Sequence, residues 1–288
     1  MHSSTDQTGR QAPPGLLDTV SLEITGKDVK ELQAAAAQIP PGTRVNITFL
    51  GNESMALRVE AARVVRELGF RPVPHVSARR LRSQEDLKDY LAALAEVEAV
   101  EEIVVIGGDP PEPEGPFPDA LSVISTGLLG AQGVRHVNVA GYPEGHPKID
   151  DDALWQAVEQ KWAALREQNL SCSVTTQFGF DTGPVVAWIE KLRAREIDSP
   201  IRVGVPGPAG VQRLLRYARR FGVQSSASVV QKYGLSLTGL LGTAGPNRFV
   251  ESLESELDTD RHGDVSLHFY TFGGVRATAE WIQNARHE

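Results

Sequence analysis

Several features that would assign this chain to a familiar class are missing from its 288 residues. Cys172 is its single cysteine, so no internal disulfide can form and a reducing, cytoplasmic location is expected. No stretch reaches the ~18 apolar residues that cross a bilayer, and the polar first residues have no apolar signal-peptide core. The sequence predicts a disordered tail over 1–15 and one domain over 16–288, without membrane contact.

Basic charge and ligand-binding motifs are also scarce. The chain has 29 basic against 37 acidic residues and a formal charge of −8, which argues against a nucleic-acid-binding surface. No pair of histidines shares a helix face and no Cys-x-x-Cys occurs, so no metal site is expected. The glycine-rich dinucleotide and phosphate loops are absent too. A nucleotide would have to use backbone amides at helix starts.

What the chain does have is a strand-then-helix unit repeated eight times. Each strand candidate is a nearly continuous apolar run, as expected for buried parallel strands. The strand candidates are 20–24, 44–50, 72–77, 102–107, 136–141, 171–178, 201–205 and 265–272. Helical patterns follow at about 28–38, 53–69, 83–97, 119–130, 151–168, 184–195, 209–221 and 275–286. The fold class predicted is α/β, a single (β/α)8 barrel, with an extra helical segment over 225–241 before the eighth strand.

Polar residues gather at the ends of these strands, where barrels of this kind carry their chemistry. Glu23 and Asp109 are conspicuous because a carboxylate within an apolar strand is costly unless it has a partner. Each alone could cap a loop, but together at one barrel mouth they predict an acid and an electrostatic partner. His136 and His268 are expected to be structural. The proline-rich loop 110–118 fits either a lid or a rigid connection.

Five segments in order resemble one family, the methylenetetrahydrofolate reductases. Val73-Pro-His-Val-Ser77 is similar to its Pro-His-Leu-Thr segment, and Gly108-Asp-Pro-Pro111 to its Arg-Gly-Asp-x-Pro loop. Val139-Ala-Gly-Tyr-Pro-Glu-Gly-His-Pro147 resembles Ala-Tyr-Pro-Glu-x-His-Pro, Thr176-Gln-Phe-Gly-Phe-Asp181 resembles Thr-Gln-Phe-Phe-Phe-Asp, and His268-Phe-Tyr-Thr271 matches His-Phe-Tyr-Thr. The resemblance covers nearly the whole barrel.

The resemblance implies an oxidoreductase that passes hydride from NADH or NADPH through FAD to 5,10-methylenetetrahydrofolate, giving 5-methyltetrahydrofolate. It implies that Glu23 is the general acid and that Asp109 stabilises the iminium cation near flavin and pterin. Gln177 and Phe272 would contact the folate. The residues implied to bind FAD are Thr48, His75, Gly108, Asp109, Tyr142 and His146.

The chain departs from the family pattern at several nucleotide contacts. Gly107 stands where the family has an arginine for the flavin phosphates, and Gly210 stands where it has a stacking aromatic. These departures leave open a flavin-independent route, with direct hydride transfer from NADH to the folate. A pterin-binding barrel that transfers a methyl group is a further alternative. The choice of NADH or NADPH and a homo-oligomeric state stay open.

Overall fold

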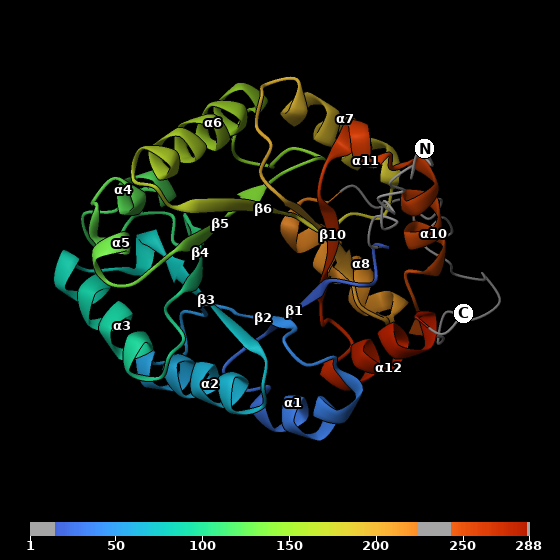
Figure 1. Cartoon of the computed structure of the whole chain (residues 1–288), viewed down its shortest axis with the longest axis horizontal. Coiled ribbons are helices and arrows are strands. Elements are labelled where there is room, and N and C mark those ends of the chain that lie inside the picture. Colours follow the sequence, from blue (N-terminus) through green and yellow to red (C-terminus); the bar gives the residue numbers. More distant parts are fainter. Residues whose placement is uncertain (1–14, 224–242, 287–288) are drawn as a thin grey trace, which may run out of the picture.

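The computed structural model describes residues 15–223 and 243–286, and its centre is a closed barrel of eight parallel strands (Figure 1). Around the barrel the strands follow the order β1-β10-β7-β6-β5-β4-β3-β2. Their bounds are β1 Val20–Ile24, β2 Arg44–Ile47, β3 Arg71–Ser77, β4 Glu102–Ile106, β5 His136–Gly141, β6 Ser171–Thr176, β7 Ile201–Pro206 and β10 Val265–Tyr270. The predicted (β/α)8 barrel is therefore confirmed.

Helices form a ring around the strands and bury apolar faces against them (Figure 1). Ser54, Ser83 and Asp150 cap helices by accepting a backbone N–H three residues on. The helices are α1 Val29–Ala35, α2 Met55–Glu67, α3 Gln84–Glu96, α4 Ala120–Ile124, α5 Leu128–Ala131, α6 Asp151–Glu167, α7 Thr182–Arg193, α8 Val211–Phe221, α10 Asn247–Glu256, α11 Thr259–His262 and α12 Val275–Ala285, with short 3₁₀ turns at Ala36–Gln38 and Ala78–Arg80. In the described ranges no helix is long and apolar enough to cross a membrane.

The structure corrects several element boundaries. The second strand ends at Ile47 rather than at residue 50, and the eighth barrel strand ends at Tyr270 rather than at 272. The helical pattern at 119–130 is two helices, because Gly127 takes a left-handed conformation with φ of 71° between them. The expected tail over 1–15 lies outside the described residues except for Gly15. The extra helical segment expected over 225–241 lies wholly outside them.

Four short elements around the last barrel strand were not predicted from the sequence. Residues 209–210, expected to start a helix, form β8 (Ala209–Gly210), which pairs antiparallel with β9 (Thr243–Ala244). The segments of α10 and α11 were assigned no structure. Runs this short have too little periodicity to be recognised.

The proline-rich loop after β4 is fastened to the neighbouring loop after β3. Glu114 donates its backbone N–H to the Arg79 carbonyl at 2.7 Å, and the Phe117 side chain is buried. A Cβ at Gly115 would lie 2.3 Å from the Arg82 carbonyl oxygen, so the two loops touch backbone to backbone. The loop is therefore an anchored connection.

A buried charge cluster fills the barrel at the amino-terminal ends of the strands. Glu102 on β4 accepts hydrogen bonds from Arg44 on β2 at 2.9 Å and from Arg202 on β7 at 2.8 Å. Burial raises the pKa of Glu102, but the two guanidinium groups outweigh it and the net pKa is lowered. His136 donates to or accepts from Ser173 at 2.7 Å, and burial lowers its pKa to about 4. The cluster thus ties β2, β4 and β7 together across the interior.

We expect Glu102→Gln to destabilise the fold by about 3–5 kcal/mol, because it leaves two largely buried guanidinium groups without a counter-charge. Urea unfolding at neutral pH measures the change. Glu280→Gln, which removes the exposed partner of Arg276 on α12, is the matched control and should change the unfolding free energy little. Equal effects of the two substitutions would show that the cluster does not hold the barrel together.

Candidate active site at the barrel mouth

Alternate residues of β1 point into the barrel and place Glu23 near its carboxyl-terminal mouth. Ser21, two residues earlier, contacts His268 on the neighbouring strand β10, and Glu23 lies one layer above it. The Glu23 side chain is 18% exposed, so its carboxyl group is partly withdrawn from solvent. Its backbone carbonyl accepts the Thr271 hydroxyl at 2.6 Å, which joins the two strand ends. The sequence placed Glu23 correctly at this end.

Two imidazoles lie beside the Glu23 carboxyl group, one from the adjacent strand β10 and one from β3, two strands away on the other side. Nε2 of His268 lies 3.6 Å from Glu23 Oε2, and Nε2 of His75 on β3 lies 3.7 Å from the same oxygen. Both nitrogens are buried, and neither has a hydrogen-bond partner among the described residues. A small inward movement of the carboxyl group would bring either nitrogen to hydrogen-bonding distance. His268, expected to be only structural, is therefore part of the site.

The hydroxyl of Ser21 lets His268 match either protonation state of Glu23. Its Oγ lies 2.9 Å from His268 Nδ1 and 3.4 Å from the Leu267 carbonyl oxygen. If Ser21 donates to Nδ1, then Nε2 carries the proton and can donate to a carboxylate. If Ser21 instead accepts from Nδ1 and donates to Leu267, then Nε2 can accept from a protonated carboxyl group. Ser21 was missed from sequence, although its i, i+2 spacing from Glu23 on a strand was a usable signal.

Burial keeps the imidazole of His75 neutral. It lowers the pKa of His75 to about 4, although the Glu23 carboxylate acts in the opposite direction. Burial and Glu23 both raise the pKa of the Tyr270 phenol well above its ordinary value, so it stays protonated and donates to the Thr176 carbonyl at 3.1 Å. Neutral His75 and protonated Tyr270 thus lie near the Glu23 carboxyl group.

Aromatic rings gather on the β6–β10 side of the mouth. Phe272 contacts Phe178 edge-on at a ring-centroid distance of 5.0 Å and stacks on Tyr270 at 5.6 Å. Tyr217 of α8 stacks on the other side of Phe272 at 4.1 Å with an interplanar angle of 9°. Gln177, directly after β6, is half-buried at this edge and accepts the Phe178 backbone N–H. The cluster offers an apolar wall with one amide beside it, suited to a planar heterocycle.

Asp109 lies at the same end of the barrel but has a different environment from the one expected. Its side chain is 73% exposed and forms an ion pair with Arg80 at 2.7 Å. Gly108 before it has φ of 97°, and a Cβ there would lie 2.2 Å from Ser77 Oγ, so the turn needs glycine. The neighbours of Glu23 are thus two histidines rather than Asp109. The sequence predicted the position of Asp109 on the rim but not its partner.

The other candidate residues also lie at the rim. Thr48 follows β2, and its hydroxyl is buried without a partner in the described part of the chain. Tyr142 and His146 follow β5 and contact each other edge-on at 5.3 Å. Over the described ranges no group of three or more His, Cys, Asp or Glu side chains could hold a metal ion.

We expect the His75 ring to stay neutral through pH 6 and pH 5, titrating only near its pKa of about 4. Because this pKa lies below the ordinary value of 6.5, the unfolded chain takes up the proton first, and the stability that neutral His75 contributes is lost as the pH falls from about 6.5 to about 4. Imidazole NMR resonances report the titration. Glu23→Gln should lower the His75 pKa further, because the carboxylate raises it; an unchanged or higher value would contradict the arrangement.

Comparisons with known proteins agree with this architecture. The family model described as methylenetetrahydrofolate reductase matches residues 27–286. A thermostable aldo-keto reductase solved with the inhibitor epalrestat is 12% identical, with a TM-score of 0.50 over 100% of this chain and 94% of its own. Dihydropteroate synthase of Thermus thermophilus is 14% identical with a TM-score of 0.49, covering 94% of this chain and 95% of its own. At such low identities a likeness to a solved structure bears on the fold alone.

The family assignment rests on the family model, which spans nearly all of the barrel and every strand-end residue considered above except Glu23 and Ser21. The chain belongs to the methylenetetrahydrofolate reductase family, whose members are folate-related oxidoreductases of one-carbon metabolism.

Proposed function

We propose that this protein reduces 5,10-methylenetetrahydrofolate to 5-methyltetrahydrofolate with a hydride from NADH or NADPH. The observation that carries the proposal is a partly buried carboxyl group set between two imidazoles, beside an aromatic wall, at the mouth of the barrel. This arrangement can give a proton to a bound heterocycle. The family membership supplies the substrate class.

The proton step falls to Glu23. Its carboxyl proton passes to N10 of the folate, the N10–methylene bond breaks, and the methylene group stays on N5 as an iminium cation. A hydride then adds to the methylene carbon and gives the 5-methyl group, so one proton and one hydride are consumed. When Glu23 becomes a carboxylate, His268 with its proton on Nε2 and Ser21 donating to Nδ1 can donate a hydrogen bond to it, which stabilises the new charge.

The pterin ring would lie along the aromatic cluster that contains Phe272, with Gln177 hydrogen-bonding its edge. Tyr217 and Tyr270 stack on Phe272 and fix its plane. Asp109 would stabilise the iminium cation; with 73% of its side chain exposed it can turn from Arg80 toward a bound cation. This role for Asp109 depends on that movement.

FAD, the relay implied by the family, fits the residues of this chain only in part. The unpartnered Thr48 hydroxyl and His75 Nε2 could meet the polar edge of a flavin ring, and Tyr142, His146 and Gly108 would border it. The arginines described near the loop after β4 are already engaged by protein groups. Gly107 opens onto empty space, Arg80 is paired with Asp109 and Glu114, and Arg79 is engaged by two backbone carbonyls. We therefore favour direct hydride transfer from NADH or NADPH to the folate.

A methyl-transfer reaction finds less support. A thiolate acceptor would have to be Cys172, which is buried on β6, and burial raises the pKa of its thiol to about 11. A thiol in that state is a poor nucleophile at neutral pH.

Glu23→Gln keeps the shape of the side chain and removes its proton. We expect kcat for methylenetetrahydrofolate reduction to fall by about 10²–10⁴-fold with little change in KM, because general acid catalysis acts in the transition state. Steady-state kinetics with NADH test this, and a melting experiment confirms that the variant is folded. Glu85→Gln on the exposed start of α3 is the control and should match the wild type. A folded Glu23→Gln variant that retains full kcat would show that Glu23 is not the acid.

The direct route predicts that the purified protein carries no flavin absorption and needs none. Oxidation of NADH by methylenetetrahydrofolate should proceed at the same rate with and without added FAD, because Gly107 stands where the family has an arginine for the flavin phosphates. Absorption spectra and rates after exhaustive dialysis decide the matter. Stoichiometric bound flavin, or a rate that depends on added FAD, would show that the hydride passes through FAD. Neither result would contradict proton donation by Glu23.

A further inference from the structure

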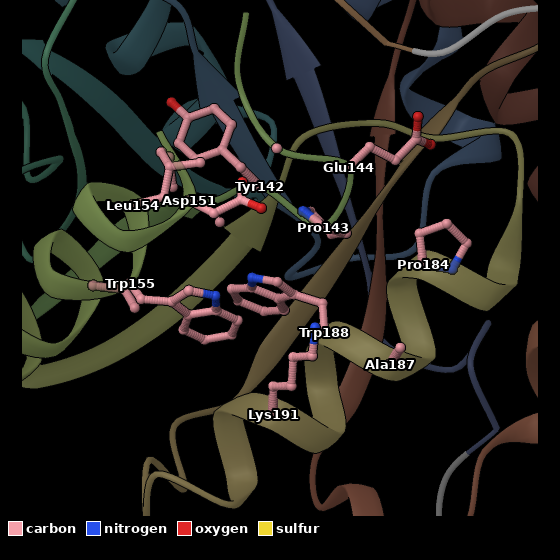
Figure 2. Close-up of a pocket in the computed structure, with 14 residues that line it drawn as sticks. Tyr142, Pro143, Glu144, Asp151, Leu154, Trp155, Pro184, Ala187, Trp188 and Lys191 are labelled. Atoms are coloured by element: carbon pink, nitrogen blue, oxygen red, sulfur yellow. The ribbon is translucent and has the colours of Figure 1, made fainter. Parts of the chain in front are cut away.

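A cavity lies outside the barrel, between α6 and α7, behind the loop that leaves β5. Its volume is about 290 Å³, close to the lower end of the ~300–1,000 Å³ typical of ligand sites. Figure 2 shows the side chains around it, contributed by the two helices and by the loop that contains Tyr142 and Glu144. Neither Glu23 nor either of its imidazole neighbours lines it.

Two indoles form the apolar part of the cavity wall. Trp155 of α6 and Trp188 of α7 are stacked with centroids 5.5 Å apart and an interplanar angle of 20° (Figure 2). Trp188 packs on the backbone of Gly141, where a Cβ would lie 2.8 Å from the indole. The Arg195 guanidinium covers Trp155 at 4.0 Å. The indoles are thus fixed, and they border an open space that ordinary close packing would fill.

Charges of opposite sign stand at different points of the rim. Lys191 of α7 lies beside Trp188, while Asp151 of α6 lies on the other side of the indoles (Figure 2). Neither side chain has an ion-pair partner within residues 15–223 and 243–286. A cation beside an aromatic wall suits an anionic group attached to a flat ring. The carboxylate of Asp151 suits an exocyclic amine of that ring.

We propose that this cavity binds an adenine nucleotide unit, with the base against the indoles, its amine toward Asp151 and its phosphate on Lys191. Two sources share this chemistry. One is a free mononucleotide; the other is the adenylate half of the hydride donor, since Tyr142 borders both the cavity and the barrel mouth. Only the second source rests on the proposed function.

Calorimetric titration of the full chain with AMP, read in parallel by tryptophan fluorescence, tests the site without any turnover. Lys191→Ala should weaken AMP binding by about tenfold or more, because a charge-assisted contact is lost. Ala187→Leu should abolish binding, since Ala187 lines the cavity and leucine is a good helix former on the exposed face of α7. Lys88→Ala, an exposed lysine on α3, is the matched control and should bind AMP as the wild type does.

Adenosine and ribose 5-phosphate separate the two halves of the ligand, and each should bind more weakly than AMP. The KM for NADH identifies the source: a rise in Lys191→Ala indicates the adenylate half of the dinucleotide, and an unchanged KM indicates a free mononucleotide. The proposal is overturned if AMP gives no saturable signal at millimolar concentration, if ribose 5-phosphate binds as well as AMP, or if neither Lys191→Ala nor Ala187→Leu weakens binding. None of these outcomes bears on proton transfer by Glu23.

Discussion

Closure of the parallel sheet is the constraint on which the rest of the molecule depends. The hydrogen-bonded pairing of β1 with β10 joins the first and last strands, so Ser21 meets His268 across 247 positions of the sequence. Because successive side chains alternate between the two faces of a strand, the same pairing directs Glu23 and Tyr270 into the interior. The site is thus a product of barrel closure. No local segment could hold the acid between imidazoles from β3 and β10.

The interior of the barrel is unusually polar, and its polarity is arranged in layers. Two arginines and one glutamate lie at the amino-terminal end, and histidine, serine and asparagine side chains lie above them. Buried charges are tolerated only when they are paired and hydrogen-bonded, a condition that the lower cluster meets. The upper layer leaves hydrogen-bonding groups unsatisfied, at Asn46, Thr48, His75 and His268. A polar heterocycle bound at the carboxyl-terminal mouth of the barrel would form the hydrogen bonds that these groups lack.

The sequence predicted the barrel because eight periodic units are a strong signal that survives errors in any single unit. It also predicted the rim positions of Glu23, Gln177 and Asp109, because strand ends in this fold share one face. The partners of those residues were not predictable. The role of His268 depends on which strand pairs with β1, and the ion pair of Asp109 depends on how the loop after β3 folds beside it. The short strand β8 was missed because its partner lies more than thirty residues away.

The two carboxylates of the rim differ in how they respond to the surrounding solution. The Asp109 carboxylate stands largely in water, although its partner Arg80 is mostly buried, and dissolved ions screen exposed charges over about 8 Å at physiological ionic strength. The Glu23 side chain is mostly buried below that water. Added salt therefore loosens the outer pair and frees Asp109 to move, while the inner proton donor keeps its surroundings. The surroundings of Asp109 on the rim therefore change with the ionic strength of the medium, and those of Glu23 inside the barrel do not.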